Sequence, residues 1–119
     1  MKTGRLCRGD DCVVPRVWRA DSWWSRLRGL LGRRPLAADG AEALWLSPCN
    51  SVHTFWMGYP LDLLFLGRDG EVLGWREGVK PWRASGQRGA HATVEFRAGG
   101  LSRIEPVMGE VLQWQAIDA

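Results

Sequence analysis

The sequence predicts a mainly β fold, a β-sandwich or partly open barrel of about seven short strands with one N-terminal α-helix. Short segments rich in β-branched and aromatic residues are separated by turn signals along most of the chain. One segment alone has clear helical periodicity, at about residues 22–31. The 119 residues leave room for one domain, and an apolar content of 45% suffices for a packed core.

The expected helix at about residues 22–31 has both a beginning and an end in the sequence. Asp21 or Ser22 can cap it, since a side-chain oxygen accepts a hydrogen bond from an unpaired N–H of the first turn. Gly32 is a suitable stop, and Pro35 cannot continue a helix. Its apolar residues recur three and four positions apart and share one face: Trp23, Leu27, Leu30 and Leu31.

The expected strands are short and lie between Gly, Pro and Asp residues. Asp69-Gly70 tolerates the positive φ of a hairpin turn, and Gly99-Gly100 marks a second turn. A loop is expected at about 78–89. We expect residues 1–11 to be a flexible tail and residues 12–119 to be a single β domain. The expected strands cover residues 13–19, 43–46, 52–57, 62–66, 71–76, 92–97 and 111–117.

Charge and composition limit which binding partners and which cellular compartment the sequence predicts. The formal net charge is +3, and eight arginines fall in the first 34 residues. A solvated face explains this excess, and without a nucleic-acid motif we predict no nucleic-acid partner. We predict no transmembrane segment, and the polar first eleven residues lack a signal peptide's apolar core, which predicts a cytoplasmic location. Three cysteines, an odd number, fit a reducing compartment with free thiols.

The eight tryptophans are spread through the chain and are expected to serve packing rather than one aromatic platform. The densest group of chemically useful side chains lies at 48–57, where a thiol, an imidazole and several hydroxyl or amide groups fall within ten residues. Along an extended strand His53 and Met57 would share one face, and Thr54 and Trp56 the other. The candidate site residues are Arg26, Cys49, His53, Thr54, Trp56, Met57 and Asp62.

Two catalytic roles can be written for this group. His53 could act as a general base oriented by Asp62, or Cys49 could be activated as a thiolate beside the imidazole. The simpler interpretation is structural: a single His beside apolar residues usually fills a core or edge position, and a lone Cys packs as a small hydrophobe. Asp62 would then tie down the adjacent turn through backbone contacts. Nothing in the spacing selects a catalytic triad.

A metal site would need a different set of residues. Cys7 and Cys12 are separated by four residues and Cys49 and His53 by three, and together they offer a ligand set that zinc accepts. The first pair lies in the expected tail, and the spacing is wider than the usual two. We therefore predict no metal and no cofactor. The alternative for the first pair is two exposed thiols that cross-link to each other on oxidation.

Several stretches in fixed order resemble the domain of unknown function 192 family. They are RLRGLLGR at 26–33, SVHTFWM at 51–57, PLDLLFL at 60–66, DGEV at 69–72, VEF at 94–96, AGG at 98–100 and MGE at 108–110. The resemblance implies a small, mainly β bacterial or archaeal domain, closest to a jelly-roll-like sandwich, with no assigned activity. The family's motif positions fall here on Arg26, Gly29, His53, Thr54, Met57, Pro60, Asp62, Gly70 and Gly99.

Two departures from the family pattern are visible. Leu31 stands where many members have Met, a conservative change. Gly58 stands where members usually carry a polar or basic residue, so this chain lacks any ligand contact that such a side chain makes. Many members resemble exported or membrane-anchored proteins, whereas the start of this chain does not predict a leader.

Three functions remain open, and the first is favoured. It is a non-enzymatic binding or accessory module for an unknown protein or a small polar ligand, its groove lined by His53, Trp56, Asp62 and Arg26. Exposed Trp rings beside polar groups suit sugars or peptides. The resemblance associates some members with cell-envelope or pilus assembly. The second is a hydrolase or metal-dependent enzyme using His53 and Asp62, and the third a purely structural protein without a small-molecule site.

Geometry separates these functions. An enzyme requires His53 within about 3 Å of Asp62 or Cys49 in an accessible cleft. An open groove flanked by Trp56 and Trp82 would favour binding.

Overall fold

The computed structural model describes residues 2–20, 35–54 and 58–117. Within these ranges the chain is mainly β, as predicted, and forms one open, mixed sheet with strand order β6-β5-β8-β3-β2-β1-β9. β4 and β7 pair with each other as a two-stranded ribbon. The strands are β1 (Lys2–Arg8), β2 (Asp11–Ala20), β3 (Glu42–Leu46), β4 (Ser51–His53), β5 (Leu61–Leu66), β6 (Val72–Val79), β7 (Ala84–Gly86), β8 (Ala92–Arg97) and β9 (Gln113–Ala116), with a 3-10 turn η1 (Leu101–Arg103).

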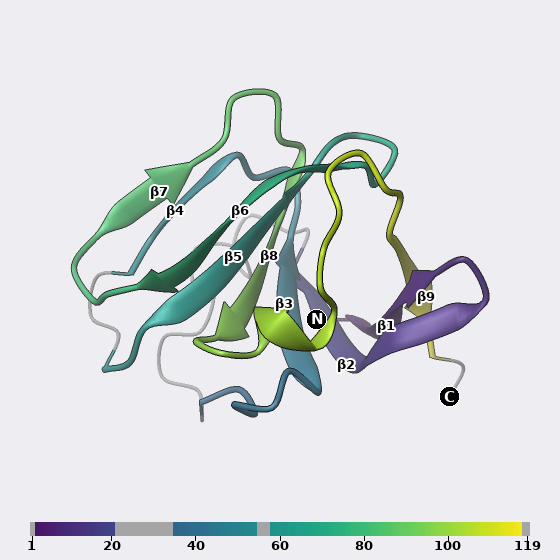
Figure 1. Ribbon diagram of the computed structural model, residues 1–119, viewed down its shortest axis with the longest axis horizontal. Helices are drawn as coiled ribbons and strands as arrows, with labels where there is room; N and C mark the ends of the chain where they lie inside the picture. Colours follow the sequence, from purple (N-terminus) through teal and green to yellow (C-terminus); the bar gives the residue numbers. More distant parts are fainter. Residues whose placement is uncertain (1, 21–34, 55–57, 118–119) are drawn as a thin grey trace.

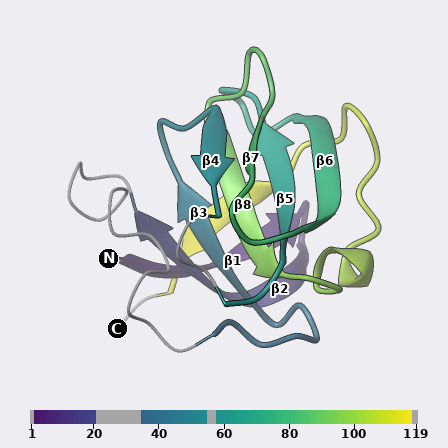
Figure 2. The ribbon, with the colours of Figure 1, turned by 90° about the vertical axis from the view of Figure 1, so that its left-hand side faces the viewer.

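The layers follow from this order (Figure 1). The ribbon lies over one face of the large sheet, and a view turned by 90° shows β4 and β7 in front of it (Figure 2). β2 and β3 run parallel, while the other paired strands of the large sheet are antiparallel. The expected helix at 22–31 lies outside the described residues.

Two segments differ from the sequence-based expectation. Residues 2–8, expected to belong to a flexible tail, form β1, which pairs with β2 on one side and β9 on the other. Leu6 and Cys7 are buried in β1, but the polar residues around them interrupt the apolar–polar alternation that would predict a strand. Within the expected loop at 78–89, residues 84–86 form β7 because β4 supplies a pairing partner.

The large sheet is mostly apolar on both faces, since its central strands β5 and β8 are buried at every position except Arg97. The ribbon-side cluster consists of Ala20, Leu36, Leu44, Leu46, Leu61, Leu63 and Phe65, and Cys49, Val52 and Tyr59 pack against it. The far-side cluster includes Leu6, Val14, Leu64, Leu66, Val94, Phe96, Leu101 and Ile104. Burying each such Leu or Phe contributes about 1.5–3 kcal/mol.

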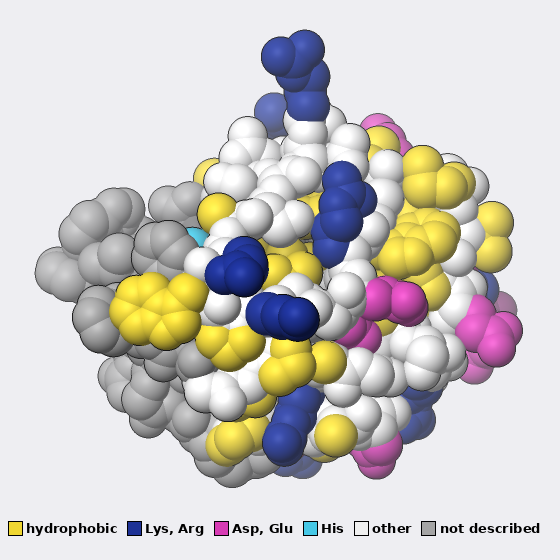
Figure 3. All heavy atoms as spheres, turned by 60° about the vertical axis from the view of Figure 1, so that its left-hand side comes forward, with side chains coloured by type: hydrophobic (Ala, Val, Ile, Leu, Met, Phe, Trp, Pro, Cys, Tyr) yellow, Lys and Arg dark blue, Asp and Glu magenta, His cyan; other side chains and the backbone are white. Residues whose placement is uncertain are grey.

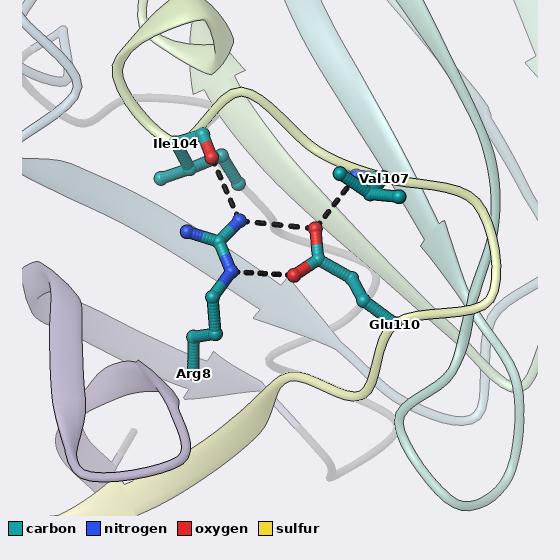
Figure 4. A network of polar contacts seen from close by, with 4 residues as sticks. All are labelled: Arg8, Ile104, Val107 and Glu110. Atoms are coloured by element: carbon teal, nitrogen blue, oxygen red, sulfur yellow. Dashed lines mark hydrogen bonds and ion pairs between the residues drawn. The ribbon is translucent and has the colours of Figure 1, made fainter.

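An ion pair fastens the β1–β2 hairpin to the segment before β9 (Figure 4). Arg8 Nε donates to Glu110 Oε1 at 2.5 Å, and Arg8 Nη2 donates to Glu110 Oε2 at 3.0 Å and to the Ile104 carbonyl at 2.8 Å. The Val107 N–H donates to Glu110 Oε2 at 2.6 Å. Hydrogen bonding from Arg8 lowers the pKa of Glu110, against a smaller opposing effect of burial.

Candidate functional site

Thr54 follows β4 and fixes the loop between β6 and β7. Its side chain is fully buried. The hydroxyl donates to the Lys80 carbonyl at 2.6 Å and accepts the Arg83 N–H at 2.9 Å. Its backbone N–H donates to the Arg83 carbonyl at 2.8 Å, and its carbonyl accepts the Trp82 N–H at 3.2 Å. These contacts hold the 80–83 loop on both sides of its tip.

The tip of this loop presents Trp82 to solvent. The side chain is 52% exposed, and the backbone has a φ of 64°. A non-glycine residue in the left-handed region costs about 1–2 kcal/mol, so the surrounding hydrogen bonds must hold it there. Lys80 and Arg83 on either side are exposed as well. The loop thus carries an exposed aromatic residue with an exposed cationic residue on either side of it in the sequence.

This side of the molecule is rich in positive charge. Figure 3 turns it toward the viewer and shows several Lys and Arg side chains interspersed with hydrophobic ones. The Arg76 guanidinium lies over the Phe65 ring, 5.9 Å from its centre, and the Arg97 guanidinium lies 5.4 Å from the centre of the Tyr59 ring. Because Phe65 and Tyr59 belong to or pack on the ribbon-side cluster, both cations lie on that side.

Cys49 precedes β4 and His53 is its last residue, and the two lie in different environments. His53 is exposed at the end of β4 and pairs across the ribbon with Ala84. Cys49 is half-buried, and its thiol donates to the Ser51 carbonyl at 3.1 Å. Its carbonyl accepts the Thr93 hydroxyl at 3.1 Å. Cys49 therefore packs against the ribbon-side cluster as a small side chain with local backbone contacts.

Asp62 has a structural environment on the face of the sheet opposite the ribbon. Its buried carboxylate accepts backbone N–H groups of Gly78 at 2.8 Å, Gly99 at 2.9 Å and Leu101 at 3.1 Å. These bonds hold the end of β6 and the turn after β8, in line with the backbone role expected for this residue. Asp62 alternates with residues of the ribbon-side cluster along β5 and so points to the other face of the sheet. The structure does not bring it together with His53.

Of the remaining candidates, Arg26, Trp56 and Met57 lie outside the described residues. The four possible zinc ligands are not assembled. Cys7 and Cys12 occupy paired positions across the β1–β2 hairpin, with Cα atoms 3.9 Å apart, and are joined by a disulfide. The expectation of free thiols was wrong for this pair, while Cys49 is free. Residues 2–20, 35–54 and 58–117 contain no group of three or more His, Cys, Asp or Glu placed to hold a metal.

Sequence reasoning missed Glu95, the most unusual ionisable group of the described chain. It lies in the middle of β8, with Leu44 of β3 and Leu63 of β5 as cross-strand neighbours. Its side chain is 6% exposed, and burial raises its pKa to about 7. Alternation along β8 turns Glu95 away from Val94 and Phe96, which belong to the far-side cluster, and toward the face that the ribbon covers. A charge between Val94 and Phe96 was the available signal.

Tyr59 lies close enough to Glu95 to respond to its charge. Burial raises the pKa of the Tyr59 hydroxyl, the Glu95 carboxylate adds to this, and Arg97 acts in the opposite direction. The hydroxyl oxygen is buried and has no hydrogen-bond partner within the part of the chain that the structure describes. Glu95, Tyr59 and Arg97 thus form a polar cluster on the ribbon side of an apolar sheet.

The fold and these surroundings define a small, mainly β domain with a rigid, basic and aromatic loop. Residues 6–114 match the domain of unknown function 192 family, DUF192, described as uncharacterized ACR, and the chain belongs to this family. No curated protein matches the sequence. Within the described residues no helix is long and apolar enough to cross a membrane.

Two crystal structures share the fold. A protein of unknown function from Novosphingobium aromaticivorans is 20% identical, with a TM-score of 0.76 over 94% of this chain and 84% of that one. A protein described as a "putative transcription regulator" from Sinorhizobium meliloti is 22% identical, with a TM-score of 0.73 over 95% of this chain and 92% of that one. At these identities the likeness shows the fold alone.

Proposed function

We propose that the protein is a non-enzymatic binding module that holds an extended segment of a partner protein against the β4–β7 ribbon. The observation that carries this proposal is Trp82, an aromatic side chain kept exposed in a strained backbone by the buried Thr54. Backbone strain that tertiary contacts maintain is typical of functional sites. Tryptophan is also enriched among the residues that dominate binding energy at protein interfaces.

The enzyme alternative has less support. A His–Asp pair needs its two side chains within hydrogen-bond reach. The Asp62 carboxylate instead accepts hydrogen bonds from three backbone N–H groups, on the face of the sheet that the ribbon does not cover. Cys49 donates its thiol to a local carbonyl. A purely structural protein is the remaining alternative, and the absence of any peptide ligand would favour it.

Selection from a library of random dodecapeptides, followed by affinity measurement on the selected peptides, tests this proposal. Trp82→Ala should weaken binding about 30-fold or more, the loss expected for a central interface tryptophan. Met108→Ala is the matched control, because Met108 is 60% exposed on the segment before β9. Thermal unfolding checks that both variants fold. Unchanged affinity in Trp82→Ala, or no selected peptide, would contradict the proposal.

Three finer expectations stay predictions. They are a cytoplasmic location, the absence of a nucleic-acid partner and a link to envelope or pilus assembly. Cell fractionation, oligonucleotide titration and co-purification in the source organism would test them in turn. Native mass spectrometry with metal analysis on gently purified protein would test the prediction that no cofactor is bound.

A further inference from the structure

We propose that the segment bound at this site is acidic and pairs with the outer edge of β7 as a third strand of the ribbon, an inference that rests on the proposed function. Three features of the described residues support it: an edge strand with an accessible backbone, an excess of positive charge around it, and the position of Trp82 beside its first residue.

The edge strand β7 is suited to receive another backbone. No strand of the described chain other than β4 pairs with it, and it lies on the outside of the molecule in Figure 1. Its sequence, Ala84-Ser85-Gly86, carries only small side chains, with Ala84 and Gly86 exposed. Small side chains let a second strand approach to the usual spacing of about 4.8 Å. Addition of a peptide strand to such an edge is a recurrent mode of recognition.

The register identifies which backbone groups would form the new bonds. Thr54 N–H donates to the Arg83 carbonyl, and Gln87 N–H donates to the Asn50 carbonyl, on either side of β7. In an antiparallel pair the residues alternate between facing the partner and facing away. Ala84 and Gly86 therefore point their N–H and C=O groups toward the outer edge, where an added strand would bind them.

The positive charge around β7 indicates which kind of peptide segment would bind there. Residues 76–91 contain four basic residues and one acidic residue, Glu77, a net of 4 − 1 = +3 that equals the formal net charge of the whole chain. The four are Arg76, Lys80, Arg83 and Arg88, all exposed. Arg83 immediately precedes β7 and Arg88 follows it by two residues. An extended peptide on β7 would place its side chains between these two cations, so acidic side chains complement the site at both ends.

Trp82 supplies the apolar contact. It lies two residues before β7, at the end of the ribbon where Thr54 holds the loop. An apolar side chain of the bound strand that alternates with acidic ones would reach the same side as this ring. The expected ligand is an extended segment of alternating acidic and apolar residues, about six to eight residues long.

The test uses two blocked octapeptides, one of alternating Glu and Val and one of alternating Lys and Val, together with a dT8 oligonucleotide. The Glu peptide should bind the intact protein, and the double variant Arg83→Glu/Arg88→Glu should lose at least tenfold in affinity. Arg68→Glu, an exposed charge reversal in the β5–β6 turn, is the control and should change affinity less than twofold. Amide hydrogen exchange should slow at Ala84 and Gly86 on binding, with little change at Ser85.

The outcomes separate the inference from the function on which it rests. If the Lys peptide binds equally well, or the double charge reversal has no effect, the bound segment is not acidic and the inference is overturned. If Trp82→Ala still loses affinity in that case, the proposed binding function holds. Binding without protection at Ala84 and Gly86 overturns strand addition. Binding of the oligonucleotide in preference to the peptide overturns both the acidic segment and its pairing. If no peptide binds and Trp82→Ala changes nothing, the inference and the proposed function fail together.

Discussion

Replacing Glu95 with Gln removes a carboxyl that lies 6% exposed at the centre of β8, between Leu44 and Leu63. The two side chains have nearly the same size, so the packing of the ribbon-side cluster is kept. What changes is the titration, because Gln stays neutral at every pH. The substitution therefore isolates the free energy that the buried carboxyl contributes to stability as it ionises.

The direction and size follow from the pKa of Glu95. It is about 7 in the folded protein against an ordinary 4.5. Between these pH values the unfolded chain releases its proton while the folded chain keeps it, so the free energy of unfolding falls as pH rises from about 4.5 to about 7. Above pH 7 both states are ionised and the loss is complete. At about 1.4 kcal/mol per pKa unit, the complete loss amounts to about 3.5 kcal/mol.

Urea denaturation at pH 5, 6, 7 and 8 measures this difference. Part of the loss has already occurred at pH 5, so the free energy of unfolding of the variant should rise relative to that of the intact protein by about 2.5 kcal/mol between pH 5 and pH 8. This holds whatever constant offset the amide introduces. Comparing the change with pH, rather than the stability at one pH, cancels that offset. Parallel stability curves for the two proteins would refute the raised pKa of the buried Glu95 carboxyl.

Three further predictions concern the fold and the 80–83 loop. Asp62→Ala should destabilise the protein by about 3–5 kcal/mol because three backbone N–H groups lose their acceptor. In urea denaturation its effect on the free energy of unfolding should add to that of His53→Ala. Coupling between the two substitutions would instead support a catalytic His53–Asp62 pair. Arg8→Met should cost about 1–2 kcal/mol near neutral pH. Since Arg8 lowers the pKa of Glu110, that stabilisation is present above about pH 4.5 and is lost as the pH falls below it, so acid titration of the variant should be flatter. Thr54→Val should cost about 1–3 kcal/mol and speed amide exchange at Trp82 and Arg83, while exchange in β8 keeps its rate.

The strands that the sequence predicted are those whose own residues favour the extended state. The alternation at 92–97 and the apolar run at 62–66 match β8 and β5 closely, because central strands must fill both faces with apolar side chains. β7 was not predicted, since Ala-Ser-Gly has low strand propensity and is extended only through pairing with β4. β1 was missed because few of its residues are apolar.

The candidate site was predictable by composition but not by geometry. The segment 48–57 was recognised as unusual, yet the roles of Thr54 and Asp62 depend on partners 16–39 residues away in the sequence, at Arg83, Gly78 and Leu101. Such partners follow from strand order, which local patterns do not encode. Glu95 was overlooked for the same reason, because only the covering ribbon makes its face of β8 an interior one.

Two costly features lie on the same side of the large sheet. One is the carboxyl of Glu95 in an apolar layer, and the other is the left-handed backbone of Trp82. On the opposite face, by contrast, the Asp62 carboxylate is satisfied by three backbone N–H groups and the surrounding side chains are apolar. Sequences that fold well depart from local consistency mainly where function requires it. Glu105, which follows Ile104 of the far-side cluster, also has a left-handed backbone, with a φ of 46°, so backbone strain alone does not distinguish the two faces. The ribbon side is distinguished because it combines a strained, exposed aromatic residue with a buried carboxyl, and binding is to be sought there.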